Sequence, residues 1–202
     1  MNNVKKILKN TFLILFSIII SFFIYRFITI NLLDFIPFVI TNKIPLYISI
    51  VLVQSIIIFI ILLGIINNKL DSFSKKLLWL QYFIILLFLL FGRNIGVKGV
   101  ELNILNSSKS WLSNSYNVVI TIANLLMYMP LSLNFTNKNP KKIIPVMLFL
   151  IIIFESIQYM LSLGVFDVGD IILNIIGFII GLKVFKSKSM TKLKNIFQIN
   201  KE

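Results

Sequence analysis

The sequence predicts an all-α fold, a polytopic membrane bundle of about six transmembrane helices that forms a single membrane domain over residues 1–202. Of its 202 residues, 58% are hydrophobic and only 13% are charged, a balance that is unusual for a soluble domain. Uncharged apolar runs of about 20 residues, the length that crosses roughly 30 Å of hydrocarbon, recur along the chain. Short lysine clusters separate these runs, which is typical of the loops of multi-pass membrane proteins.

Six runs are long enough to span a membrane. After Lys9 at its start, the first carries only Arg26, near its end, where a long side chain can reach the interface. The second is uncharged and the third is the shortest. The fifth contains Glu155 well inside, and the sixth contains Asp170 near its start. The predicted spans are residues 8–30, 44–66, 77–92, 117–135, 143–163 and 168–185.

The distribution of lysines predicts the orientation of the spans. The chain has four lysine-rich segments. One precedes the first span, one follows the second, one separates the fourth from the fifth, and one follows the sixth. With six spans all four fall on one face, which the positive-inside rule makes cytoplasmic. The sequence therefore predicts a multi-pass membrane protein with both termini in the cytoplasm. The four groups are Lys5, Lys6 and Lys9; Lys69, Lys75 and Lys76; Lys138, Lys141 and Lys142; and Lys183, Lys186, Lys188, Lys192, Lys194 and Lys201.

The composition excludes several classes of function. The chain has no cysteine and no histidine, so thiol nucleophiles, disulfides, zinc fingers, haem ligation by histidine and Ser-His-Asp catalysis are ruled out. The net charge of +13 would suggest nucleic acid as a partner in a soluble protein. Here the membrane orientation explains the charge, so no nucleic acid, no metal and no cofactor are expected.

Within the membrane domain the chain divides into parts of different character. Residues 1–76 form a two-span part without a recognised motif, and residues 186–202 form a basic cytoplasmic tail. The longest external connection, residues 93–116, contains Trp111, which we expect at the membrane interface. In the tail, Met190, Leu193, Ile196 and Phe197 have helical spacing among lysines. This predicts either an amphipathic helix on anionic inner-leaflet lipid or a solvated basic tail.

Three of the predicted spans carry polar stripes, which are costly in lipid and therefore suggest a functional site. At 100° per residue, Glu155 and Gln158 share a face of the fifth span, and Asp170 and Asn174 share a face of the sixth. Asn124 lies on the polar face of the fourth span, where Pro130 interrupts the helical hydrogen bonds and predicts a kink. The candidate binding residues of this polar pocket are Glu155, Gln158, Asp170, Asn174, Asn124 and Asp167.

Each of these features also has a structural interpretation. Gly177 and Gly181 have the spacing of small residues at close helix contacts, so we expect them to serve packing. Asn124 and Asn174 could form interhelical hydrogen bonds instead of binding a ligand. For Asp167 we favour a helix N-cap, stabilised by free amides and the helix dipole. Glu155 has the weakest structural alternative, because a buried carboxyl group is a costly way to fill space.

The segment from residue 90 to 185 resembles the VanZ-like family of small bacterial integral membrane proteins. The family's Glu-x-x-Gln helix is matched by Glu155 and Gln158. Its Asn-x-x-x-x-x-Pro-x-Gly element is matched by Asn124 and Pro130, with Ser132 in place of the glycine. The remaining family positions, Phe-Asp-x-x-Asp-x-x-x-Asn-x-x-Gly-x-x-x-Gly, are filled by Phe166, Asp167, Asp170, Asn174, Gly177 and Gly181. The resemblance implies a role in the cell envelope and reduced sensitivity to glycopeptide antibiotics of the teicoplanin type.

Three functions are consistent with these residues. The first is a protein that binds or shields a membrane lipid or lipid-linked cell-wall component through a polar site in the outer half of the membrane. The second is an intramembrane enzyme that acts on a lipid-linked envelope substrate with Glu155 or Asp170 as general acid or base, although the sequence shows no nucleophile with an activating base. The third is a small proton-coupled carrier, although no inverted repeat is evident.

The polar stripes make a geometric prediction. At 1.5 Å per residue, Glu155, Asn174 and Asn124 lie about 12, 9 and 10 Å below the outer ends of their spans. Because the depths agree, these three residues and Asp170 should converge on one pocket with an external mouth.

Overall fold

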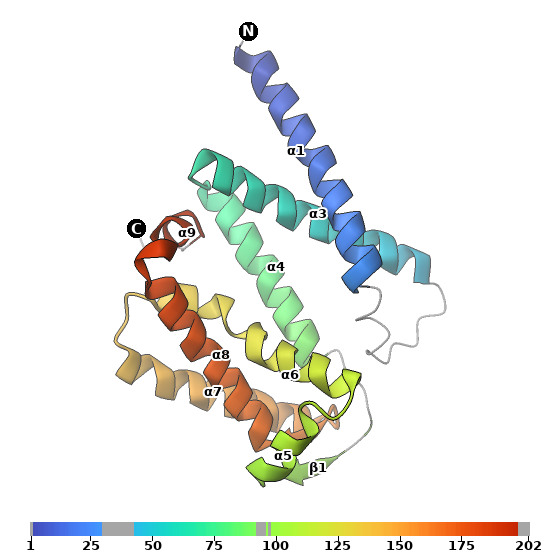
Figure 1. Cartoon of the computed structure of the whole chain (residues 1–202), viewed down its shortest axis with the longest axis vertical. Coiled ribbons are helices and arrows are strands. Elements are labelled where there is room, and N and C mark those ends of the chain that lie inside the picture. The colour runs from blue at the N-terminus through green and yellow to red at the C-terminus, as the bar shows by residue number, and fades with distance from the viewer. Residues whose placement is uncertain (1, 30–42, 92–95, 97, 198–202) are drawn as a thin grey trace. The chain divides into compact units, whose positions relative to one another are not determined.

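The computed structural model describes residues 2–29, 43–91, 96 and 98–197, and the described chain is almost entirely helical (Figure 1). Among these residues, six helical segments are long and apolar enough to cross a membrane: Val4–Phe27, Tyr47–Asn67, Ser72–Phe91, Ser115–Phe135, Pro140–Met160 and Val168–Lys186. The all-α prediction is confirmed, and each predicted span has its helix. The last residues of the first and third predicted spans, 30 and 92, lie outside the described residues.

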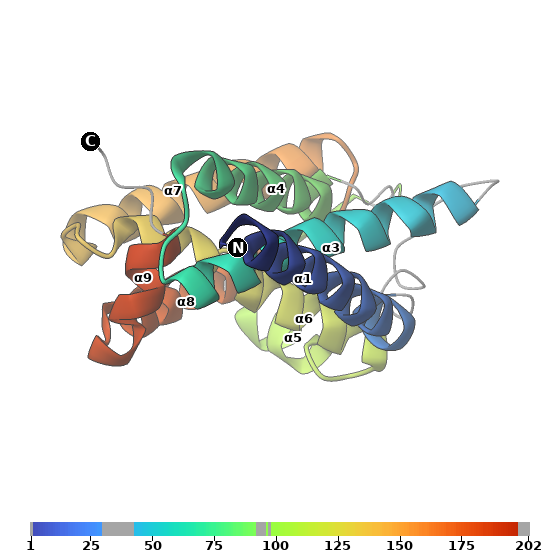
Figure 2. The same cartoon turned by 90° about the horizontal axis from the view of Figure 1, so that it is seen from above.

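The chain forms two compact units, residues 1–82 with 195–202, and residues 83–194. In the first unit, α1 (Asn2–Ile24) and the π-helical turn η1 (Tyr25–Thr29) pack against α3 (Lys43–Asn67). Figure 2 shows α1 crossing α3. At the crossing the buried Ser21 hydroxyl donates to the Val51 carbonyl at 2.7 Å, and Gln54 donates to Thr29 at 2.7 Å. These hydrogen bonds join two helices whose outer faces are almost wholly apolar.

The other end of α3 forms the core of the first unit. Ile60, Leu70 and Ile196 are buried together, and Phe59, Leu63 and Leu77 pack around them. Gly64 allows the close approach, because a Cβ there would meet Ile196 Cγ2 and a Leu70 side-chain carbon, both at 2.9 Å. The short C-terminal helix α9 (Thr191–Phe197) has the helical conformation that its spacing predicts. Its Ile196 side chain is buried against protein and does not face outward, as an amphipathic helix on lipid would require.

The second unit contains the end of α4 (Ser72–Phe91), then β1 (Gly99–Glu101), α5 (Ile104–Ser110), α6 (Ser115–Met127) and the 3₁₀-helix η2 (Pro130–Phe135). These are followed by α7 (Pro140–Met160), β2 (Val165–Asp167), α8 (Val168–Lys186) and the 3₁₀ turn η3 (Lys188–Met190). Helix α8 contacts α5, α6, η2 and α7. It is the central helix of the unit, with 44% of its most apolar stretch buried against 28% or less in the other described spans.

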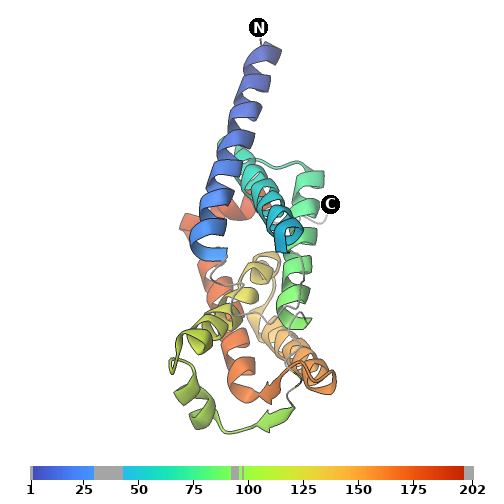
Figure 3. The ribbon, with the colours of Figure 1, turned by 90° about the vertical axis from the view of Figure 1, so that its right-hand side faces the viewer.

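Two short strands close one end of the second unit. β1 and β2 pair in parallel with Val100 opposite Phe166, and they lie side by side near α5 (Figure 3). The sequence predicts only an external connection over residues 93–116, and the structure adds β1 and α5 within it. The pairing places the segment before α5 directly against the residues that lead into α8.

Candidate functional site

The second unit contains a cavity of about 250 Å³ between α6, the end of α7 and the start of α8. Five of the six candidate binding residues line it: Asn124, Glu155, Gln158, Asp167 and Asp170. The cavity lies where α6 begins, α7 ends and α8 begins, which is the end of these helices opposite the lysine-rich segments around Lys141 and Lys186. The separate polar stripes of three helices therefore meet at one place.

Helix α7 supplies Glu155 and Gln158. Most other large side chains of this helix are apolar. Glu155 is nevertheless buried, with only 5% of its surface exposed. The Gln158 side-chain amide donates to the Leu90 carbonyl at 2.7 Å, which provides a partner for one of the free carbonyls at the end of α4. The rings of Phe154 and Phe91 meet edge to face beside this contact. Gln158 thus has a structural role in addition to lining the cavity.

The first turn of α8 supplies Asp167 and Asp170. Asp167 is the N-cap residue, as its position predicts, and its Oδ1 accepts from the Gly169 amide at 2.6 Å. The same oxygen accepts from the Ser107 hydroxyl of α5 at 2.6 Å. Gly169 is required here, because a Cβ on it would lie 2.5 Å from Ser107 Cβ. These contacts hold α5 over the start of α8 and keep Asp167 at the cavity wall.

Helix α6 supplies Asn124, together with Thr121 and Asn117 one and two turns earlier on the same face. Asn124 is only 2% exposed, and its Nδ2 has no hydrogen-bond partner among the described residues. The Thr121 hydroxyl donates to the Trp111 carbonyl at 3.1 Å and so ties the end of α5 to α6. The start of α6 is fixed by Asn114, whose side chain accepts from the Asn117 amide at 2.9 Å.

Asn174 is the exception among the candidate residues. It is 1% exposed, but it does not line the cavity, which corrects the prediction that it converges there with Glu155 and Asn124. The physical reason is the close crossing of α6 and α8 one turn further along, where a Cβ on Gly177 would overlap the Leu125 backbone carbonyl. Asn174 lies in this tight part of the interface. Neither Asn174 Oδ1 nor Asn124 Nδ2 has a partner among the described residues, so the interhelical hydrogen bond between these two atoms is not formed.

Gly181 and Pro130 occupy the other end of the same helix contact. A Cβ on Gly181 would lie 2.6 Å from the Met129 carbonyl oxygen and would also overlap the Ser132 hydroxyl. The kink predicted at Pro130 is a break instead: α6 stops at Met127, the Met129 amide donates to the Leu126 carbonyl at 3.2 Å, and the 3₁₀-helix η2 follows. Both glycines therefore lie at close helix contacts, as their spacing predicts, and Pro130 begins the 3₁₀-helix that follows α6.

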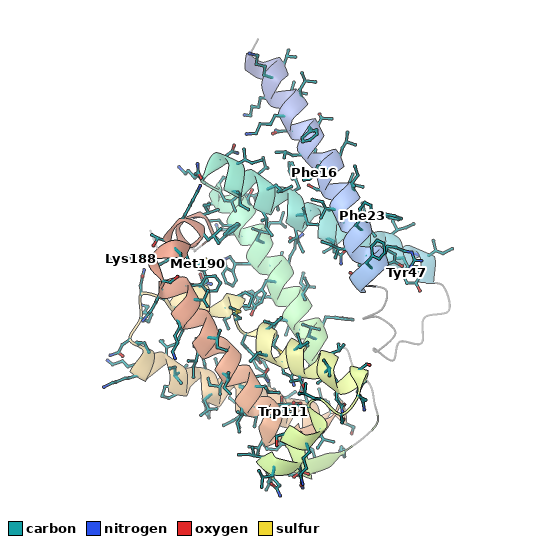
Figure 4. All side chains as sticks on the ribbon, viewed as in Figure 1. Phe16, Phe23, Tyr47, Trp111, Lys188 and Met190 are labelled. Carbon is teal, nitrogen blue, oxygen red and sulfur yellow. The ribbon has the colours of Figure 1, made fainter. Side chains whose placement is uncertain are left out.

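Sequence reasoning missed several cavity residues. Trp111, at the end of α5 (Figure 4), was expected at the membrane interface, but it lines the cavity and its indole Nε1 is buried without a partner among the described residues. Ser110 and Tyr116 also line the cavity. These residues lie in the connection between spans, where no helical periodicity marks a face. The only sequence signal for these cavity residues is that Trp111 lies close in the chain to a span with a polar face.

The described lining of the cavity is polar and aromatic. This described lining includes three carboxyl groups, the two aromatic rings of Trp111 and Tyr116, and no lysine or arginine. No group of three Asp, Glu, His or Cys among the described residues could hold a metal ion. The Ser110 hydroxyl donates to the Ser107 carbonyl at 2.7 Å, so this hydroxyl is paired with backbone and not with a base. The arrangement can bind a small polar group between acceptors and aromatic faces.

Comparison with known proteins identifies the family of this chain. No curated protein and no solved structure matches it. A family model described as VanZ/LLP1 matches residues 82–190, which include the whole cavity. Because the match covers more than half of the chain and the chain has six apolar helices, this multi-pass membrane protein belongs to the VanZ/LLP1 family.

Proposed function

We propose that this protein binds a component of the bacterial cell envelope in the cavity of its second unit and thereby lowers sensitivity to glycopeptide antibiotics of the teicoplanin type. The observation that carries the proposal is the convergence of Asn124, Glu155, Gln158, Asp167 and Asp170 on one cavity. Polar groups in membrane helices are costly and usually functional, so five of them around one space are better explained by a ligand than by packing.

The proposal includes an orientation in the plasma membrane. The cavity lies at the ends of α6, α7 and α8 that are distant from the clusters Lys138–Lys142 and Lys183–Lys188. If the positive-inside rule holds, those clusters and both termini are cytoplasmic and the cavity opens toward the cell wall. A lipid headgroup or the head of a lipid-linked wall component would then enter from the outer leaflet.

The size of the cavity limits what it binds. At about 250 Å³ it is smaller than the roughly 300–1,000 Å³ of pockets that hold drug-sized ligands. A whole glycopeptide does not fit. The protein would therefore act on the antibiotic indirectly, by binding or shielding an envelope component on which the antibiotic depends.

Binding explains the described residues better than catalysis. Two hydroxyl groups of the lining, those of Ser110 and Thr121, donate to backbone carbonyls, and neither is held by a base. General acid–base chemistry by Glu155 and Asp170 is the remaining catalytic possibility, and turnover of a labelled lipid-linked wall precursor by the purified protein in bilayers would reveal it.

A second contact with the membrane is proposed for the C-terminal tail. Ile196 is buried in protein, so insertion of the apolar face of α9 into lipid is not part of this proposal. Lys188 and Lys192 are exposed, and lysines near a cytoplasmic surface contribute about 1 kcal/mol each to attraction by anionic lipid.

The test is the tolerance of a teicoplanin-sensitive bacterium that expresses the protein. The wild type should raise the inhibitory concentration of teicoplanin, and Glu155→Gln or Asn124→Leu should remove the increase with unchanged amounts of protein in the membrane. Ser156→Ala is the matched control, because Ser156 lies on the same helix, does not line the cavity and donates to the Ile152 carbonyl. Unchanged tolerance in both cavity variants would contradict the proposal.

A further inference from the structure

Two buried N–H groups of the cavity lining have no hydrogen-bond partner among the described residues. One is Nδ2 of Asn124, whose side chain is only 2% exposed, and the other is the indole Nε1 of Trp111. Both residues line the cavity. Because buried donors in folded proteins are normally paired, we expect a ligand in the cavity to supply an acceptor oxygen to them.

The two donors belong to neighbouring segments of the second unit. Asn124 lies on α6, and Trp111 directly follows α5. The hydroxyl of Thr121, one helical turn before Asn124, donates to the Trp111 carbonyl at 3.1 Å. This bond holds the Trp111 backbone beside the face of α6 that carries Asn124. A carbonyl oxygen has two acceptor lone pairs, so a single ligand carbonyl has the capacity to accept from both donors.

The described lining favours an uncharged acceptor over an anion. It contains no lysine or arginine, the side chains that usually bind phosphate and carboxylate groups. Free amides at a helix N-terminus also bind anions, but both helices that begin at the cavity are capped by their own side chains. At α6 the Asn114 side chain accepts from the Asn117 amide at 2.9 Å. At α8 the Asp167 carboxylate accepts from the Gly169 amide at 2.6 Å.

Apolar side chains and a small volume limit what accompanies the acceptor oxygen. Leu90, Ile120, Leu163 and Val165 line the same cavity. Its volume of about 250 Å³ accommodates a carbonyl group with a short acyl end, which the apolar side chains would contact. The ester carbonyl of a membrane phospholipid continues into a long acyl chain, for which this cavity has no room.

We propose that the cavity binds a short N-acyl group of the acetamido type. Its carbonyl oxygen accepts from Asn124 Nδ2 and Trp111 Nε1, and its methyl group packs against the apolar part of the lining. This inference rests on the proposed function, since it names the ligand class of the same cavity. An envelope component has two sources of such a group, an N-acetylated sugar and an N-acetylated peptide, and the acetamido chemistry is common to both.

The indole nitrogens provide a direct test in the full-length protein in phosphatidylcholine nanodiscs. The chain has two tryptophans, and the Trp79 indole already donates to the Phe197 carbonyl at 3.2 Å. After isotope labelling of both indole nitrogens, N-methylacetamide should shift the Trp111 indole proton downfield in a saturable way, because a new acceptor deshields it. The Trp79 signal should stay in place, and inorganic phosphate should move neither signal.

Two variants remove one donor each. Asn124→Ala should weaken N-methylacetamide binding about two- to tenfold, the factor that one neutral hydrogen bond contributes, as followed by the Trp111 signal. Trp111→Phe keeps an aromatic ring without the N–H and should weaken binding by a similar factor, as followed by saturation-transfer NMR of the ligand. This second variant decides the matter if the first does not fold. Asn106→Ala is the matched control, because Asn106 is exposed and does not line the cavity.

Two larger ligands distinguish the sources of the acetamido group. Tighter binding of methyl N-acetylglucosaminide than of N-acetylalanine methylamide identifies a sugar, and the reverse order identifies a peptide. Methyl glucoside, which has a hydroxyl group in place of the acetamido group, should bind at least about tenfold less well than its acetamido counterpart. Equal binding of these two glycosides, a shift of the Trp111 signal by phosphate, or no Trp111 shift with any acetamido ligand would overturn the inference.

Teicoplanin tolerance separates failure of this inference from failure of the proposed function. If no acetamido ligand binds while Asn124→Leu still abolishes tolerance, the ligand class is wrong and the proposed function stands. If acetamido ligands bind and the wild type does not raise tolerance, the proposed function is wrong and the ligand class stands.

Discussion

At the scale of single residues, Gly177 decides how closely α6 and α8 approach. A Cβ at this position would overlap the backbone carbonyl of Leu125, which cannot move as a flexible side chain can. We therefore expect Gly177→Ala to destabilise the protein by about 1–3 kcal/mol, the usual cost of overpacking. Thermal unfolding in detergent measures the change. Gly164→Ala is the control, since nothing lies within 4 Å of a Cβ there, and equal unfolding temperatures for the two variants would contradict the close crossing.

A second residue-scale prediction concerns Asp71, which lies just before the first residue of α4. The hydroxyl and then the amide of Ser74 donate to its carboxylate, at 2.7 and 3.1 Å, and these bonds hold the pKa of Asp71 below its ordinary value. Because the folded pKa is the lower one, this stabilisation is complete above the ordinary pKa and is lost as the pH falls through the lowered pKa. Ser74→Ala should raise the pKa of Asp71 toward its ordinary value, as measured by the carboxyl carbon shift in an NMR titration. An unchanged titration would show that the hydroxyl bond is not formed.

At the scale of elements, the tail helix α9 is held by the core of the first unit. Ile196 is 1% exposed against Ile60 and Leu70, and the Trp79 indole donates to the Phe197 carbonyl at 3.2 Å. Replacing a buried Ile by Ala costs about 2–5 kcal/mol, so Ile196→Ala should release the end of the helix. The expected result is faster tryptic cleavage after Lys194. The exposed Thr191→Ala should cleave at the wild-type rate, and equal rates for both variants would argue against the buried tail.

How much of the fold was predictable differs from element to element. The apolar spans follow from the sequence because length and hydropathy are local properties, and the polar faces that carry Asn124, Glu155 and Asp170 follow from helical spacing. The paired strands β1 and β2 were not found, since each has three residues and Gly99 pairs with a residue far along the chain, Val165. No short sequence pattern predicts pairing between segments so far apart in the chain.

The same limit explains the errors in the candidate site. Trp111 reaches the cavity only because Ser107 of α5 bonds to Asp167 and Thr121 bonds to the Trp111 carbonyl. The depth of Asn174 along its helix predicts that it reaches the cavity. Depth alone does not show that Gly177, one turn further along, brings α6 and α8 into close contact. Stripes predict which face is polar. Packing decides which polar residue reaches open space.

At the scale of the whole molecule, the chain combines a family segment with an additional part. The VanZ/LLP1 match covers residues 82–190 and nearly coincides with the second compact unit, residues 83–194. The first unit contributes two further apolar spans and buries the end of the tail. The described cavity residues all belong to the second unit, so the proposed binding site lies in the family segment.

The most direct measurement asks whether the cavity opens to the outside of the cell. The chain has no cysteine, so single cysteines can be introduced and labelled without background. Asn117 lines the cavity, and Lys141 lies at the opposite end of the helices of this unit. A membrane-impermeant maleimide added to intact cells should label Asn117→Cys and should label Lys141→Cys only after permeabilisation. Labelling of Lys141→Cys in intact cells, with Asn117→Cys protected until the membrane is opened, would contradict an outward-facing site.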